Sequence, residues 1–218
     1  MGHSMADLTL YHIAPSRSSV ALWMLEEIGE PYDIHLLSMQ RGTNREPAYL
    51  AINPMGKVPA IRHGDTVVTE AAAICAYLAD AFPAARLAPR AGDRLRGPYY
   101  RWLFFAAGPF DAAWTNKAMG FAVPQERERM MGYGRFEHVI DALEGAVSRA
   151  EYVVGDSFTA ADVCIGSSIG FGLQFGAIEK RPAFERYWQR VSARPAALRA
   201  KEIDDALAVP QPQTQPPG

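Results

Sequence analysis

The chain has 218 residues, of which 49% are hydrophobic and 21% are charged, a composition typical of a globular protein with one or two domains. Its formal net charge of −2 provides no general attraction to nucleic acid or to an anionic membrane surface, so neither is expected as a partner. No apolar run approaches the roughly 18 residues that span a bilayer, and no secretory signal is visible, so a cytoplasmic protein is expected.

The opening "MGHSM" is expected to be a cloning remnant, so that the natural chain would start at Met5. Two cysteines, Cys75 and Cys164, lie far apart in segments that are both expected to be helical, and buried free thiols are favoured over a disulfide. The five histidines are scattered, without the close spacing of metal ligands, so no metal is expected.

The first part of the chain, residues 6–82, alternates between strand and helix patterns. "LTLYHI" has the pattern of a strand and runs into "APSRSSVALWMLEEIGE", which has helical spacing and a plausible C-cap at Gly29. "YDIHLL" is the second strand, and a strand, a helix and a strand in this order imply a parallel pair. A short helix near "EPAYLAI", a hairpin turning at His63–Asp65 and a helix over "EAAAICAYLADAF" complete a predicted βαβαββα order.

Pro59 interrupts the first strand of that hairpin. Proline cannot donate to a strand ladder, so Pro59 indicates an edge strand or a bend. The alternative is a cis Val58–Pro59 bond that turns a peptide outward, a deliberate feature where it occurs in folds. The residues of this segment alone leave both open.

The second part of the chain is predicted to be all helical over residues 93–206, after a linker at 83–92. "RLRGPYYRWLFFAAG" is apolar nearly all round and is expected to be buried on more than one side, with a bend at Gly108–Pro109. Thr159 stands three residues before Asp162, a variant of the capping box at a helix start. The proline- and glutamine-rich tail, residues 207–218, is expected to be disordered.

Four motifs in this order resemble the cytosolic glutathione transferases: "PSRSSVALWMLEE", "NPMGKVPAI", "TEAAAICAYL" and "GDSFTAADVCI". The similarity extends from Leu8 to about Lys201, and the pairing of Val58–Pro59 with Glu70 at a helix start is its most specific element. The resemblance implies an α/β plus all-α fold, with an N-terminal thioredoxin-like domain followed by an all-helical domain. It also implies a serine-containing member of bacterial type with glutathione as co-substrate.

The resemblance implies a cis Pro59 that exposes the backbone of Val58, which would pair with the cysteinyl part of glutathione as an added strand does. Glu70 would accept the ammonium of the γ-glutamyl group. Ala71 stands where the family has serine, and the lost hydroxyl bond would cost about 0.5–1.5 kcal/mol, although a backbone N–H at a helix start remains. Lys57 would reach the glycine carboxylate, unless it is a solvated surface lysine. Gln40 and Arg41 are further candidates for that carboxylate.

The hydroxyl that activates the glutathione thiol is expected at the start of the first helix, where Ser16 matches best and Ser18 is the reserve. Ser16 as a mere N-cap is the structural alternative. Lowering a thiol pKa by about two units requires roughly 2.7 kcal/mol. A hydroxyl bond to an anion supplies about 1.5–3 kcal/mol and a helix N-terminus about 0.3–1, so no histidine base is needed. The absence of a cysteine there disfavours thiol–disulfide chemistry.

A pocket for a small hydrophobic electrophile is expected between the two units, with Phe110 as the best single candidate. Packing in the core is the alternative for most aromatic residues on helices. The candidates for its walls are Tyr99, Trp102, Phe105, Phe110 and Trp114 on one side and Tyr11, His12 and Ile13 on the other.

The predicted function is a glutathione transferase, in the detoxification role of its family, whose thiolate attacks the electrophile. A non-catalytic glutathione-binding protein is one alternative, favoured by Ala71, and a glutathione-dependent peroxidase or isomerase is another. A homodimer is expected by family analogy, through the small-residue surface of Ala72, Ala73, Ala76 and Ala79.

Overall fold

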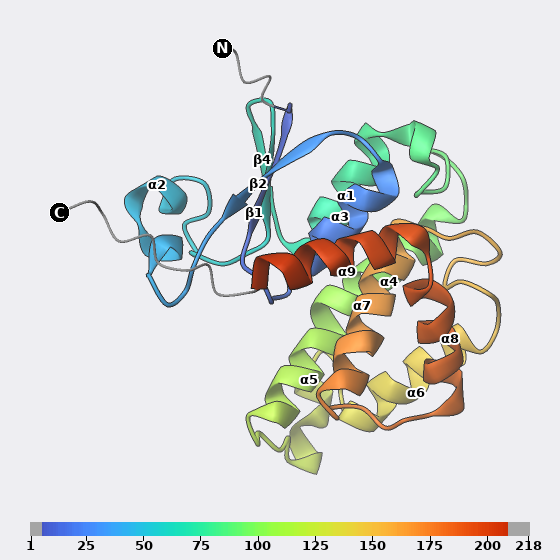
Figure 1. The fold of residues 1–218 in the computed structure, drawn as a ribbon. Coiled ribbons are helices and arrows are strands. Elements are labelled where there is room, and N and C mark those ends of the chain that lie inside the picture. The colour runs from blue at the N-terminus through green and yellow to red at the C-terminus, as the bar shows by residue number, and fades with distance from the viewer. Residues whose placement is uncertain (1–5, 209–218) are drawn as a thin grey trace, which may run out of the picture.

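The computed structural model describes residues 6–208 and joins a small sheet-containing unit to a helical bundle (Figure 1). The predicted βαβαββα order is confirmed. Its elements are β1 (Leu8–His12), α1 (Ser19–Ile28), β2 (Tyr32–Leu36), α2 (Pro47–Leu50), β3 (Ala60–His63), β4 (Thr66–Thr69) and α3 (Ala71–Ala81).

The sheet has four strands in the order β2-β1-β3-β4. Strand β1 pairs in parallel with β2, as the strand–helix–strand pattern predicts, and antiparallel with β3. Side chains of a strand alternate between the two faces of a sheet. Leu8 and Leu10 therefore lie in the main core with α1 and α3, whereas Tyr11 lies in a smaller core with Tyr49 and Leu37.

The rest of the described chain consists of helices and the loops between them. Its helices are α4 (Arg96–Phe105), α5 (Asp111–Ala118), α6 (Phe136–Val147), α7 (Ala160–Gln174), α8 (Pro182–Ser192) and α9 (Pro195–Ala208). The predicted bend at Gly108–Pro109 is a π-helical turn over Ala106–Phe110, which joins α4 to α5. Proline removes a backbone donor inside a helix, and such wide turns often accommodate the interruption.

Helix α7 is the central element of the bundle and is buried along most of its length. The predicted capping box at its start is confirmed: the backbone N–H of Thr159 donates to Asp162 Oδ2 at 2.9 Å. Gly170 allows close approach of α8, because an added Cβ would lie 2.7 Å from the ring of Trp188.

Helix α9 returns from the bundle to lie across α1 (Figure 1). The guanidinium of Arg194 donates two hydrogen bonds of 2.7 Å to the carboxylate of Glu27, whose side chain is only 5% exposed. Arg199 donates to Glu26 at 2.9 Å. The last helix is thereby fixed to the first.

Three expectations about the helices need correction. The segment over α4 was expected to be buried on more than one side, but only the face of Tyr99, Trp102 and Leu103 is buried, whereas Phe104 is 72% exposed and Tyr100 is 41% exposed. Ala79 is buried in the core, so it does not belong to an open small-residue surface of α3. Leu207 and Ala208, assigned to the tail, are the last residues of α9, and the remaining tail, 209–218, lies outside the described residues.

None of the helices within residues 6–208 combines the length and hydrophobicity that a membrane crossing requires.

Candidate active site

A cavity of about 560 Å³ lies between the loops of the sheet unit and the helices α5 and α7. Its wall has a polar part and an apolar part. The polar part includes the side chains of Ser16, Asn53, Lys57 and Glu70 with the backbone of Val58 and Ala71, and the apolar part includes the side chains of Ile13, Val20, Ala106, Phe110, Trp114 and Phe171.

The Val58–Pro59 peptide bond is cis, as the second of the two interpretations of Pro59 has it. Strand β3 begins only at Ala60, so Val58 lies outside the ladder. Within residues 6–208, none of the backbone hydrogen bonds of the turns and loops uses the N–H or C=O of Val58. This backbone is available to an extended peptide at the cavity wall.

Two side chains hold the loop that leads to Val58. The carbonyl of Lys57 accepts hydrogen bonds from the Tyr49 hydroxyl at 2.5 Å and from the Asn53 amide at 2.8 Å. Gly56 has a φ of +61°, and a Cβ there would lie 2.9 Å from a backbone oxygen of Asn44. No role was expected for Tyr49, Asn44 or Asn53 from the sequence, although the dipeptide "NP" is a signal for a turn.

Glu70 lies between β4 and α3 with a φ of 68°, in a region that non-glycine residues rarely adopt. Such a conformation costs of order 1–3 kcal/mol and tends to occur at binding and catalytic sites. The side chain is exposed and lines the cavity, and it makes no capping hydrogen bond to α3. Glu70 is thus the N-cap residue of α3 without a side-chain cap, and its carboxylate is left at the cavity beside the start of the helix.

The two candidate serines occupy different positions. Helix α1 starts at Ser19, later than expected, so Ser18 and not Ser16 is its N-cap residue. Ser16 is half-buried and lines the cavity, and its Oγ accepts a hydrogen bond of 3.1 Å from the backbone N–H of Ser18. Ser18 has no exposed surface and lies behind Ser16. Of the two hydroxyls, only that of Ser16 lies in the cavity wall.

Two residues expected in the wall of the electrophile pocket lie elsewhere. Tyr11 is on the opposite face of the sheet, where its ring packs against Tyr49 and His35. His12 is fully buried behind the serine turn, with Nδ1 2.7 Å from Ser18 Oγ. Alternation along β1 separates these neighbours. Ile13, at the end of the strand, does line the cavity.

Only some of the aromatic candidates of the helical unit line the cavity. Tyr99 and Trp102 are buried in the core, and Phe105 packs against Trp102, so none of the three lines the cavity. Phe110 and Trp114 do line it, with ring centroids 6.4 Å apart. The π-helical turn positions Phe110, the candidate that the sequence analysis preferred.

Of the three candidates for the glycine carboxylate, Lys57 is exposed and lines the cavity. Within residues 6–208 its ammonium has no ion-pair partner. Gln40 and Arg41 lie in an exposed turn and do not line the cavity, whereas their neighbour Met39 does.

Arg17 is a cavity residue that the sequence analysis missed. Its Nη1 lies 2.8 Å from Asp111 Oδ1, and its guanidinium lies 5.0 Å from the ring centroid of Trp114. Both charged side chains are about half exposed, so the ion pair contributes little stability. Its effect is to link the turn before α1 to α5 across one side of the cavity.

Cys164 also lines the cavity, and Cys75 is fully buried. Both are free thiols. A hydrogen bond with Cys164 and burial raise the pKa of the Cys75 thiol well above its ordinary value. Cys75 therefore stays protonated and unreactive. Within residues 6–208, no cluster of three or more His, Cys, Asp or Glu side chains could hold a metal ion.

Comparison with solved structures shows similar folds of known proteins. The glutathione transferase URE2P6 from Phanerochaete chrysosporium, in complex with oxidized glutathione, has a TM-score of 0.76 and 27% identity over 95% of this chain and 100% of its own. A sphingomonad glutathione S-transferase complexed with glutathione has a TM-score of 0.73 and 26% identity over 90% of this chain and 98% of its own.

Sequence comparison finds relatives of the same kind as the structural comparison does. The glutathione S-transferase GstB of Escherichia coli strain K12 is 28% identical over 84% of this chain and 91% of its own length. The family model for the N-terminal domain of glutathione S-transferases matches residues 16–81, and that for the C-terminal domain matches residues 112–195. The two matches cover more than half of the chain, and the sheet unit has the thioredoxin-like arrangement of such proteins. The chain belongs to the glutathione S-transferase family of enzymes.

Proposed function

We propose that this enzyme binds glutathione in the polar part of the cavity and activates its thiol as a thiolate, which attacks a small hydrophobic electrophile held in the apolar part. The observation that carries the proposal is the convergence of Ser16, the backbone of Val58 and the carboxylate of Glu70 on one cavity. Two relatives of the same fold were solved with glutathione or oxidized glutathione.

In this proposal the backbone N–H and C=O of Val58 pair with the cysteinyl residue, and Glu70 accepts the γ-glutamyl ammonium. Lys57 faces the glycine carboxylate, and the backbone N–H of Ala71 at the start of α3 faces the γ-glutamyl carboxylate. A helix N-terminus favours an anion. A strand-like tripeptide placed this way would bring its thiol toward Ser16.

Ser16 is the proposed thiol-activating residue. Its hydroxyl donates a hydrogen bond to the sulfur, and hydrogen bonds to charged groups contribute about 1.5–3 kcal/mol. The roughly 2.7 kcal/mol needed to lower a thiol pKa by about two units falls within that range. Phe110, Trp114 and Phe171 supply apolar surface for the electrophile.

A homodimer is proposed for the assembled enzyme. It is supported by Ala72, Ala73 and Ala76, which are at least partly exposed on α3, and by the exposed Tyr100 and Phe104 of α4. Exposed aromatic side chains of this size are enriched at protein interfaces.

The test of glutathione recognition uses a substrate analogue and a variant together. Glutathione and its N-acetylated form, which lacks the ammonium, are titrated calorimetrically into the wild type, Glu70→Gln and Glu30→Gln. Glu30 is exposed after α1 and lies outside the cavity wall. Because a charged hydrogen bond is lost, the wild type and Glu30→Gln should prefer glutathione by about tenfold or more, and Glu70→Gln should not. Equal affinities in the wild type would contradict the proposed orientation.

A further inference from the structure

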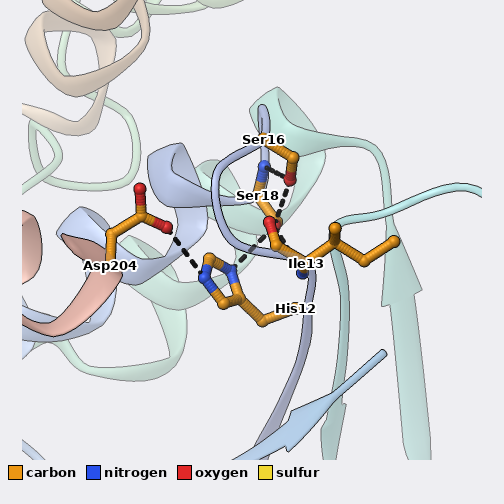
Figure 2. A network of polar contacts seen from close by, with 5 residues as sticks. All are labelled: His12, Ile13, Ser16, Ser18 and Asp204. Atoms are coloured by element: carbon orange, nitrogen blue, oxygen red, sulfur yellow. Dashed lines mark hydrogen bonds and ion pairs between the residues drawn. The ribbon is translucent and has the colours of Figure 1, made fainter. Parts of the chain in front are cut away.

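A chain of polar contacts runs from the cavity wall to the last helix (Figure 2). Ser16 Oγ lies 2.7 Å from Ser18 Oγ, which lies 2.7 Å from Nδ1 of His12. On the other side of the ring, Nε2 of His12 lies 2.9 Å from Oδ1 of Asp204. A hydroxyl at the cavity is thus connected through a second hydroxyl to an imidazole that has a carboxylate beside it.

The surroundings of this imidazole are nearly closed to water. The His12 side chain has no exposed surface, and that of Asp204 is 15% exposed. The geometry between Nε2 and Oδ1 falls short of an in-line hydrogen bond, and within residues 6–208 neither atom has another hydrogen-bond partner. Strand β2 presents Leu36 opposite His12 in the register. The carboxylate of Asp204 is the charged group that contacts the ring within the described chain.

The hydroxyl hydrogen atoms of the contacts from Ser16 through Ser18 to His12 can point in either of two directions. The carboxylate of Asp204 favours a proton on Nε2, which leaves Nδ1 of His12 as an acceptor. Ser18 then donates its O–H to Nδ1 and accepts from the N–H of Ile13 at 3.2 Å and from the O–H of Ser16. When Nδ1 carries a proton as well, every hydroxyl hydrogen reverses, and that of Ser16 points into the cavity.

We propose that His12 takes up, through Ser18 and Ser16, the proton that glutathione loses when its thiol is activated. This inference rests on the proposed function. The S–H bond breaks and its proton passes to Ser16 Oγ, the Ser16 proton passes to Ser18 Oγ, and the Ser18 proton passes to Nδ1. Both hydroxyls keep one hydrogen each, the electron pair of the S–H bond stays on sulfur, and the imidazolium forms beside Asp204.

The product of this transfer is the state that the transferase reaction requires. The Ser16 hydroxyl now donates to the thiolate, and the positive charge on His12 faces the carboxylate of Asp204. After the thiolate has attacked, the proton returns along the same chain to the leaving group or carbanion, or exchanges with water. His12 does not touch the substrate, so it acts here as a positioning and proton-holding residue. The hydrogen bond from Ser16 stabilises the thiolate, and His12 holds the proton that the thiol has lost.

A purely structural role for the pair is that Asp204 and His12 join α9 to β1. The same helix is held independently by Arg194 and Glu27. Glu27→Gln therefore weakens the docking of α9 without altering the relay, and it is the matched control for His12→Gln.

The experiment counts protons. Glutathione is added near neutral pH to weakly buffered wild type, His12→Gln and Glu27→Gln, while a pH indicator reports proton release and ultraviolet absorbance reports thiolate. S-methylglutathione, which has no thiol, gives the background. The wild type and Glu27→Gln should release well below one proton per thiolate formed, and His12→Gln should release about one. If His12→Gln fails to fold, Asp204→Asn takes its place and should release more protons per thiolate than the wild type does.

Release of about one proton per thiolate in the wild type, or equal release in the wild type and in the folded His12→Gln or Asp204→Asn variant, would overturn the relay. The proposed function would stand in that case, because thiolate would still have formed. A wild type without any thiolate absorbance would overturn both.

Discussion

The hydroxyl oxygens of Ser16 and Ser18 lie 2.7 Å apart, yet Ser16 lines the cavity whereas Ser18 has no exposed surface. One serine can therefore meet a substrate, and the other can only transmit a hydrogen bond to it. This division follows from the turn before α1, in which the backbone N–H of Ser18 donates to Ser16 Oγ.

Replacing Ser16 by alanine should lower turnover by about 10- to 100-fold, because the hydrogen bond to the thiolate is lost, and should leave glutathione affinity nearly unchanged. Steady-state kinetics and calorimetric binding measure the two quantities. Ser19→Ala removes a neighbouring hydroxyl outside the cavity wall and should behave as the wild type. An unchanged turnover in Ser16→Ala would remove Ser16 from the mechanism.

Ala71→Ser should raise glutathione affinity by up to about tenfold, because it adds a hydroxyl donor beside the proposed position of the γ-glutamyl carboxylate. Ala81→Ser places the same group on the exposed last residue of α3, outside the cavity wall, and should have no effect. Calorimetric titration compares the three proteins. An unchanged affinity in Ala71→Ser would place the carboxylate elsewhere in the cavity.

Asp162→Ala should lower the free energy of unfolding by about 3 kcal/mol or more, since buried donors would lose their acceptor and α7 would lose its cap. The carboxylate accepts from the N–H of Val153 at 2.8 Å, from the hydroxyl of Tyr187 at 2.7 Å and from two donors of Thr159. Denaturant unfolding at fixed protein concentration measures the loss. Asp156→Ala, on an exposed residue of the preceding loop, is the control, and equal losses in both variants would contradict this account.

The same carboxyl group should give stability a pH dependence. Burial raises the pKa of Asp162 above its ordinary value of 3.8, against the hydrogen bonds that favour the charged form. The folded state then binds more protons than the unfolded state, so this contribution is complete below 3.8 and is lost as the pH rises through the folded pKa. The difference in unfolding free energy between the wild type and Asp162→Asn should therefore fall as the pH rises from about 4. A difference that grows with pH would reverse the assigned direction.

The order of elements in the sheet unit was predictable because strand and helix periods are local patterns. The local pattern of the sequence did not place Pro59, Glu70 and Ser16 at one site; the resemblance to a known family did, and all three line the cavity. The phase of α4 was not predictable, because a segment that is apolar nearly all round does not indicate which of Tyr99, Tyr100 and Phe104 faces the core.

The return of α9 was also beyond local reasoning. The contacts of Glu27 with Arg194 and of His12 with Asp204 join residues at opposite ends of the chain, and no periodic pattern relates them. The expectation of His12 in a pocket wall was wrong for a different reason, because alternation along β1 is a local pattern and puts His12 on the same face as Leu8 and Leu10.

The measurement that tests the central claim most directly is the ultraviolet difference spectrum of thiolate formation as glutathione is added to the protein, followed against pH. The account predicts that the bound thiol ionises well below the value of free glutathione, which resembles that of a cysteine at about 8.5. Binding with an unshifted thiol, or no binding at all, would contradict it.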